Sequence, residues 1–242
     1  MRLKVLGSSS SGNCYILQGE SESLILECGI KFKGVEKALD YNLKNIVGTL
    51  ISHEHGDHSK YVSDFLNRFI PVYTSKGTAE ALDKRIKIVD KMKPFQIGGF
   101  KIIAFEVFHD AVDPIGFFIN HKECGNVLFA TDTYYLKPRF KGLNNILIEC
   151  NYREDILLDN VHNGRLSSFL MNRIIESHLE YNTCKEALLA NDLTDVNNIV
   201  LIHLSDGNSN AKEFKQGIER ATAKTVYVAE KGMDINFNKT PF

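Results

Sequence analysis

Long apolar runs are lacking in this chain. None approaches the roughly twenty residues that a membrane-spanning helix needs, and the apolar start is too short for a secretory signal. An excess of charge is lacking too, since the net charge at pH 7 is −1. No global field therefore draws the protein to nucleic acid, although local basic patches stay open. We expect a cytoplasmic protein without membrane contact.

Paired cysteines are also lacking. The five cysteines, at positions 14, 28, 124, 150 and 184, are widely spaced and never form a C-x-x-C pair. Cysteine zinc sites usually take their ligands from such close pairs, and an odd number of isolated cysteines does not indicate a disulfide framework. We expect small, buried thiols in a reducing compartment.

The composition that remains is ordinary for a folded protein. Hydrophobic residues make up 43% and charged residues 24% of the 242 positions, which excludes a mainly disordered or fibrous chain. This length is sufficient for one large core. Because no linker, low-complexity segment or fixed repeat interrupts the sequence, we predict a single domain over residues 1–242.

The densest cluster of metal-ligating side chains directly follows an apolar run at residues 46–51. It contains His53, His55, Asp57 and His58, although the whole chain has only eight histidines. A strand that ends in His-x-His-x-Asp-His sends alternate side chains to one side and then turns, so that the groups can converge. The stretch therefore predicts a metal site.

Three later strands, predicted from runs of apolar residues, also end in candidate ligands. These ligands are His109, Asp132 and His203. Each of them alone would more often be a structural histidine or a helix cap. Because loops at strand ends are where rigid scaffolds place chemistry, the three residues together with the histidine cluster predict one shared site.

Helical spacing predicts helices over residues 60–69, 166–176, 183–190 and 211–222. In the first of them, Phe69 is expected to pack on a sheet.

Some features have a structural and a functional interpretation. The Gly/Ser loop at residues 7–13 could hold a phosphate, but it lacks the lysine of a P-loop, so we favour a tight turn near the site. His121 has no pattern around it and is predicted to be an exposed turn residue. His162 lies in a polar stretch, which favours a solvated loop over a border of the site.

The His-x-His-x-Asp-His motif at residues 53–58 resembles the signature of the metallo-β-lactamase superfamily. Further stretches resemble its YycJ-like branch, whose members are cytoplasmic enzymes related to RNase Z and RNase J. They are residues 7–14, 109–114, 130–133 and 203–205. The resemblance implies an α+β fold, the αββα four-layer sandwich of two mixed sheets with outer helices and a site at one rim.

The resemblance also implies a role for each ligand. One metal would be held by His53, His55 and His109; the second would be held by Asp57, His58 and His203; Asp132 would bridge them. This set implies two divalent ions, with zinc the best fit to the imidazoles and manganese the alternative. A metal-bridging hydroxide would be the nucleophile, because coordination lowers the pKa of water to about 7.

Two positions depart from the pattern of the family. Glu27 stands where relatives commonly carry aspartate, so a hydrogen bond to a ligand histidine can be re-aimed. His178 matches a histidine that meets the scissile phosphate in nuclease relatives, although its neighbours differ. We predict Asp57 and His178 as the catalytic residues, with a helix-end histidine satisfied by local contacts as the alternative for His178.

The main hypothesis is a metal-dependent phosphodiesterase or nuclease. Its substrate would be nucleic acid, a cyclic nucleotide or another small phosphodiester, because the long insert of RNase J-like enzymes is missing between Asp132 and His203. A thioester or lactone hydrolase of the same fold is the second hypothesis. A catalytically silent relative that binds nucleic acid or a protein is the third. Family members often pair, so a homodimer is an expectation of the resemblance.

Overall fold

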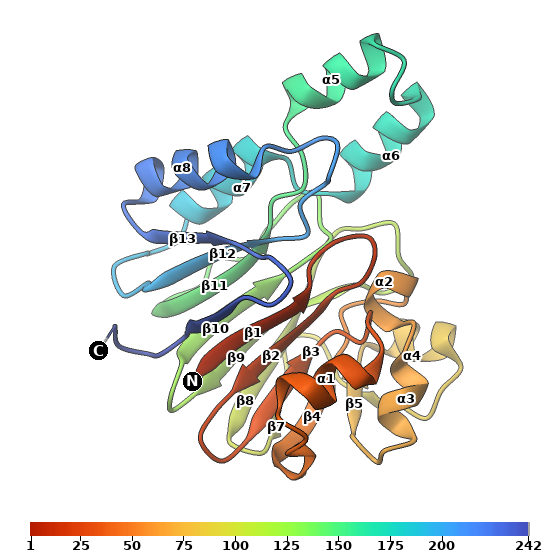
Figure 1. The fold of residues 1–242 in the computed structure, drawn as a ribbon, viewed down its shortest axis with the longest axis vertical. Helices are drawn as coiled ribbons and strands as arrows, with labels where there is room; N and C mark the ends of the chain where they lie inside the picture. Colours follow the sequence, from red (N-terminus) through yellow and green to blue (C-terminus); the bar gives the residue numbers. More distant parts are fainter. Residues whose placement is uncertain (242) are drawn as a thin grey trace.

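The computed structural model describes residues 1–241, which form two seven-stranded mixed sheets packed face to face (Figure 1). The first sheet has the order β14 (Asp234–Asn236), β1 (Arg2–Gly7), β2 (Cys14–Gln18), β3 (Ser23–Leu26), β4 (Ile46–Leu50), β5 (Val72–Thr74) and β6 (Lys87–Ile88). The second has the order β13 (Thr225–Val228), β12 (Asn198–Ile202), β11 (Leu143–Glu149), β10 (Gly125–Ala130), β9 (Ile115–His121), β8 (Phe100–Glu106) and β7 (Pro94–Ile97).

Alternation along the strands builds the layers of the core. In β3, Leu24 and Leu26 join the cluster between the two sheets, whereas Ile25 joins the cluster beneath the outer helices. Successive side chains of a strand point to opposite faces, so a strand with helices on its other face must be apolar on both sides. This explains why β3 is an unbroken apolar run after Ser23.

Helices cover the outer face of each sheet. The first sheet is covered by α1 (Phe32–Ala38), η1 (Leu43–Asn45), α2 (Gly56–Ser59), α3 (Val62–Leu66) and α4 (Lys76–Leu82); the second is covered by α7 (Tyr181–Leu189) and α8 (Ala211–Thr222). Phe214 and Ile218 of α8 are fully buried against the second sheet. The predicted αββα sandwich is therefore confirmed. Among residues 1–241, no helix has the length and hydropathy needed to cross a bilayer.

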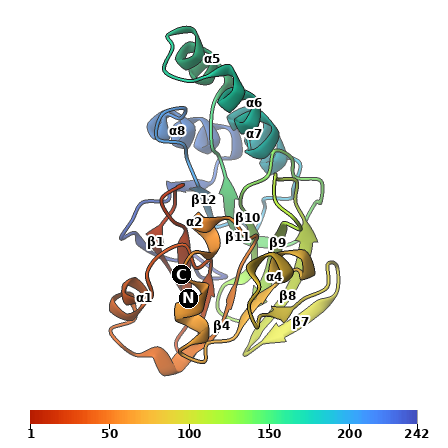
Figure 2. The ribbon, with the colours of Figure 1, turned by 90° about the vertical axis from the view of Figure 1, so that its right-hand side faces the viewer.

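Two further helices extend beyond the four layers as an arm. They are α5 (Glu154–His162) and α6 (Ser168–Ser177), which pack on each other at one end of the molecule (Figures 1 and 2). The sequence predicted α6 to within two residues, but it did not predict α5. His162 is the last residue of α5 and is exposed; the loop predicted there is helical.

The helix predicted over residues 60–69 is wrong in its bounds. The chain forms the short α2, then turns, and α3 ends at Leu66. The break has a tertiary cause, because the Tyr61 N–H donates to the Cys28 carbonyl, 3.0 Å away, and not to a helical carbonyl. Phe69 has a φ of 59° and is 94% exposed, so the side chain expected to pack on the sheet points to solvent.

Candidate metal centre

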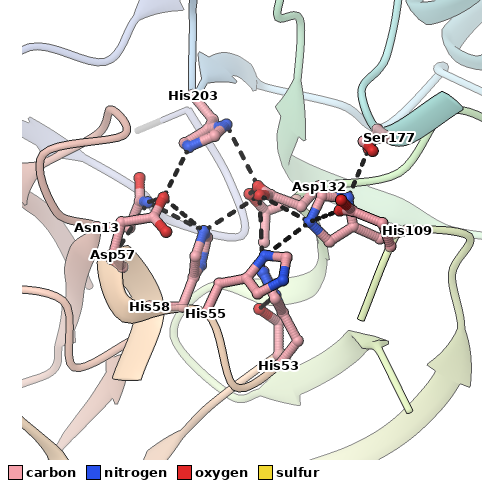
Figure 3. A network of polar contacts seen from close by, with 12 residues as sticks. Asn13, His53, His55, Asp57, His58, His109, Asp132, Ser177 and His203 are labelled. Atoms are coloured by element: carbon pink, nitrogen blue, oxygen red, sulfur yellow. Dashed lines mark hydrogen bonds and ion pairs between the residues drawn. The ribbon is translucent and has the colours of Figure 1, made fainter. Parts of the chain in front are cut away.

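The loops that follow the strands meet at one rim of the sandwich and bring all seven predicted ligands together (Figure 3). The loop after β4 and the short α2 supply four of them, and the ends of β8, β10 and β12 supply one each. The seven are His53, His55, Asp57, His58, His109, Asp132 and His203.

Three imidazoles form the first group, with one nitrogen of each within 4.8 Å of the others. The Nδ1 atom of His53 lies 2.9 Å from the Ser52 hydroxyl, which leaves the buried Nε2 without a hydrogen-bond partner. His109 donates from Nδ1 to the Ser177 carbonyl at 2.7 Å, and its Nε2 lies 3.1 Å from Nδ1 of His55. One buried nitrogen without a partner, beside two further ring nitrogens close to it, fits a common cation.

Two carboxylates and two imidazoles form the second group. The Nε2 atoms of His58 and His203 each lie 3.2 Å from Oδ2 of Asp57. Asp132 completes the group, with Oδ2 3.3 Å from Nε2 of His58 and Oδ1 3.3 Å from Nδ1 of His203. Nitrogen and oxygen donors of this kind suit zinc and manganese.

Asp132 lies between the two groups. Besides its contacts in the second group, its Oδ2 lies 3.6 Å from Nε2 of His109 and 3.8 Å from Nε2 of His53. One carboxylate therefore faces ring nitrogens of both groups, which is the arrangement expected of a residue that bridges two cations.

The charges of the site are set by burial and by the carboxylates. Burial, with neighbouring His58, holds the pKa of His53 well below its usual range. Burial on its own would raise the pKa of Asp132, but His203 and His58 lower it well below that range. For His203, burial opposes protonation, yet Asp132 and Asp57 raise its pKa to about 10. A metal binds the ionised carboxylate and the neutral imidazole, so metal binding here would displace the proton that the carboxylates favour on His203.

Three residues of the site have a strained backbone. Glu27, Asp132 and His203 have φ values of 69°, 43° and 53°, in the left-handed region that non-glycine residues rarely adopt. Each such residue costs about 1–3 kcal/mol unless its surroundings compensate for it. The fold thus accepts strain at two of the seven predicted ligands and at a carboxylate beside them.

Glu149 is a site residue that the sequence reasoning missed. It is the last residue of β11 and is fully buried. Its Oε1 lies 2.7 Å from Nδ1 of His178 and 3.1 Å from Nδ1 of His203, and its Oε2 accepts from the N–H groups of Thr133 and Leu179. The sequence did contain a signal for Glu149, because it is a lone glutamate at the end of an apolar run. The predicted ligands also follow the ends of apolar strands.

His178 lies at the C-terminal end of α6, inside the site. Its ring is centred 5.3 Å from that of His109 and 5.5 Å from that of His203. Burial opposes its protonation, but the Glu149 carboxylate raises the pKa of His178 above its ordinary value. Because Nδ1 is engaged by Glu149, Nε2 is the nitrogen left for a ligand.

Glu27, the residue that departs from the family pattern, makes its hydrogen bonds to a backbone N–H and not to a predicted ligand histidine. Both Glu27 carboxylate oxygens accept from the Ser52 N–H, at 3.2 and 3.3 Å. The Glu27 oxygen that lies nearer to His58 is 3.6 Å from Nδ1 of that ring. That nitrogen is buried without a hydrogen-bond partner. The longer side chain thus fastens the strand end and leaves the ligand histidine without a hydrogen bond there.

The Gly/Ser loop supports the site, in line with its interpretation as a turn. The Ser8 hydroxyl accepts from the His203 N–H at 2.9 Å. Asn13, which is fully buried, donates from Nδ2 to Oδ2 of Asp57 at 3.1 Å. Neither contact was predicted, because nothing in the local pattern distinguishes these two side chains from ordinary turn residues.

His121 is not the exposed turn residue that was predicted. It is the last residue of β9, it is buried, and its Nε2 lies 3.1 Å from Oε1 of Glu22. Its ring stacks on Phe100 with centroids 4.4 Å apart. A carboxylate partner and an aromatic face, both distant in sequence, make burial of this imidazole favourable.

A pocket of about 200 Å³ opens over the ligands. Three side chains of α6, Leu170, Arg173 and Ile174, form part of its wall together with His178. Arg173 also donates from Nε to Asp110 at 2.9 Å. The arm therefore borders the metal centre and shapes what can reach it.

Comparison with known proteins agrees with this geometry. The family described as the Beta-lactamase superfamily domain matches residues 25–204. The chain belongs to the metallo-β-lactamase superfamily. It is 29% identical over 234 residues to the exodeoxyribonuclease YycJ of Bacillus anthracis, covering 88% of this chain and 86% of the relative. It is also 29% identical over 233 residues to the exodeoxyribonuclease WalJ of Streptococcus pneumoniae, covering 88% and 84%. The resemblance to the YycJ-like branch is thus confirmed.

Solved structures share the fold at lower identity. The metallo-β-lactamase fold protein YhfI of Bacillus subtilis aligns with a TM-score of 0.74 at 16% identity, over 97% of this chain and 98% of that one. Human tRNase Z, short form, aligns with a TM-score of 0.63 at 16% identity, over 98% and 99%. A diphosphatase of the PhnP family aligns with a TM-score of 0.68 at 15% identity, over 97% of each chain. At these identities the likeness establishes the fold alone.

Proposed function

We propose that this protein is a metal-dependent nuclease that removes nucleotides from DNA. The observation that carries the proposal is the convergence of seven predicted ligands, five of which line one pocket together with His178, the partner of Glu149. Two relatives that match most of the chain are named exodeoxyribonucleases, which supports DNA as the substrate.

The ligand groups suit two divalent ions. One would be held by His53, His55 and His109, the other by Asp57, His58 and His203, with Asp132 between them. We favour zinc because imidazoles dominate the set, with manganese as the alternative. When bound, two such ions activate water and neutralise charge on a phosphodiester.

The residues of the chain itself would position the substrate and supply a proton. His178 presents Nε2 to the pocket, where it can donate to a phosphate oxygen or to the leaving oxygen. Glu149 fixes the ring and favours its protonated form. Arg173, on the wall of the same pocket, offers a guanidinium whose geometry matches a phosphate.

The test is a panel of substrates offered to protein loaded with zinc or with manganese. We expect labelled single-stranded DNA to be shortened from its end, with slower or no turnover of a thioester and a β-lactam. His55→Ala and Asp132→Ala should reduce cleavage to background with the fold retained by circular dichroism. His178→Ala should reduce kcat by about a hundredfold or more, as loss of a general acid does.

Two results would contradict this proposal. One is efficient thioester hydrolysis with phosphodiester turnover that His178→Ala leaves unchanged. The other is the absence of metal by elemental analysis after refolding with zinc or manganese, which would leave only a silent binding protein. Phe69→Ala, a change at an exposed side chain outside the pocket, serves as the control for both measurements.

A further inference from the structure

Helix α6 presents one of its faces to a second depression next to the metal centre. Phe169, Asn172, Arg173 and Glu176 recur at the spacing that places side chains on one face of a helix. They line a hollow of about 490 Å³, together with His109, Asp110, Tyr134 and Ser177. The hollow is large enough for a nucleoside.

Two aromatic rings are available at this hollow. Phe169 is 80% exposed and Tyr134 is 45% exposed. Tyr134 is held in place, because its N–H donates to the Phe108 carbonyl at 3.0 Å and its ring packs on that of Phe108 with centroids 5.7 Å apart. A ring that the fold holds in place, as it holds Tyr134, can bind a flat ligand at little entropic cost, and Phe169 offers a second exposed ring.

The hollow adjoins the pocket at the predicted metal centre. His109, a predicted ligand, and Arg173 line both of them. A phosphate at the metal centre would thus lie beside Arg173, and the group attached to it could extend along α6 towards Phe169. The flat group nearest to a backbone phosphate in DNA is a nucleobase.

We propose that Phe169 and Tyr134 form a stacking subsite for the base of a nucleotide adjoining the scissile phosphate. This rests on the proposed nuclease function and adds how the substrate is bound. Every base has a π-face, so such a subsite tolerates any sequence. Bases of an intact duplex are stacked on their neighbours, so the subsite selects an unpaired end.

The experiment compares Phe169→Ala with wild-type enzyme, both metal-loaded, on single-stranded oligonucleotides. One oligonucleotide carries all its bases, and two others lack the base on one or the other side of the terminal phosphodiester. Stacking contributes about 1–3 kcal/mol per base, so Phe169→Ala should raise KM for the complete oligonucleotide about 5- to 150-fold. One of the two abasic oligonucleotides lacks the base that would bind at the subsite, and for it the wild-type enzyme should already show a raised KM. Phe169→Ala should raise the KM for that oligonucleotide by less than about a further twofold.

Two further variants separate stacking from general damage. Phe169→Tyr keeps an aromatic ring and should retain wild-type KM, whereas Phe69→Ala removes a comparable exposed ring elsewhere and should also retain it. Equal effects of Phe169→Ala on complete and abasic DNA, or no effect on either, would overturn the subsite and leave the nuclease proposal intact. A wild-type enzyme that cleaves none of the oligonucleotides would overturn the nuclease proposal and the subsite together.

Discussion

Single residues set the direction of the ring nitrogens at the centre. Ser52 engages one nitrogen of His53, and the carbonyl of Ser177 engages one nitrogen of His109. In both rings the second nitrogen is then directed into the site, an arrangement that fixes tautomer and orientation before a metal binds.

Glu149 has the widest influence of the supporting residues, because one oxygen faces two histidines and the other accepts two backbone N–H groups. Replacing it with glutamine keeps the shape but leaves at least one of these donors without an acceptor. We predict that Glu149→Gln lowers the free energy of unfolding by about 1–3 kcal/mol and kcat by about tenfold or more. Urea unfolding and steady-state kinetics measure the two effects.

Glu154→Gln, an exposed change in the first turn of α5, is the matched control and should leave both quantities unchanged. If Glu149→Gln behaves like this control, the carboxylate does not hold His178 in an active orientation.

At the same scale, the sequence predicted the residues that share a motif and missed those that only support them. His53 and its neighbours are visible because four candidate ligands, three imidazoles and one carboxylate, fall within six positions. Glu149 was missed although, like the predicted ligands, it stands at the end of an apolar strand, whereas Asn13 reaches the site only through the tertiary fold. His121 failed for the same reason, since its partner Glu22 lies 99 residues away in the sequence.

At the scale of elements, α2 is fixed against the β2–β3 side of the first sheet by a very close backbone approach. Asn13 N–H donates to the Asp57 carbonyl at 2.7 Å, and Cys28 N–H donates to the His58 carbonyl at 2.7 Å. Gly29 lies beneath this contact, where a Cβ would stand 1.7 Å from the Asp57 carbonyl oxygen. Only glycine lets the two segments approach so closely.

We therefore predict that Gly29→Ala displaces Asp57 and His58. The clash involves backbone on both sides, so it should lower the free energy of unfolding by about 1–3 kcal/mol. Metal affinity, measured by competition with a chelating dye, should fall about 10- to 100-fold, as it does when support of a ligand is lost.

Gly34→Ala is the control for this change, because nothing lies within 4 Å of a Cβ at that position in α1. It should be neutral or stabilise the protein by about 0.5–1 kcal/mol. Equal metal affinity in the two variants would contradict the role given to Gly29.

The elements themselves were predictable where the pattern is local. Apolar runs located β4, β8, β10 and β12, the strands that end at the site, and helical spacing located α6, α7 and α8. The arm helix α5 and the strands β6, β7 and β14 were missed, since each is polar or short and depends on a distant neighbour for its place. The break before α3 depends on the Cys28 carbonyl, which no local pattern reveals.

For the whole molecule, the three hydrophobic clusters between the layers contain all five cysteines as free, buried thiols. Burial raises the pKa of Cys14, Cys28 and Cys150 far above the ordinary value, and it raises that of Cys124 from 9.0 to about 12. These thiols stay protonated in the folded state, which confers low reactivity.

The sign of the resulting pH dependence follows from these shifts. Above about pH 9 the thiols of the unfolded chain lose protons that the folded protein retains, so the unfolded state is favoured as the pH rises towards 12. Cys14, Cys28, Cys124 and Cys150 should each contribute a fall of up to about 1.4 kcal/mol per pH unit in the free energy of unfolding. We predict a steep loss of stability in urea between pH 9 and 10.5, and no reaction of the folded protein with a thiol reagent at pH 8.

Cys124→Ala isolates one of these groups, since Cys124 lies within the cluster between the sheets. The variant will be less stable at pH 7.5, because a buried sulfur is removed. Between pH 9 and 10.5, however, its free energy of unfolding should fall less steeply with pH than that of the wild type, by the contribution of about one proton. The slope with pH, and not the absolute stability, is the decisive quantity. A slope identical to that of the wild type would mean that Cys124 ionises as readily in the folded protein as in the unfolded chain.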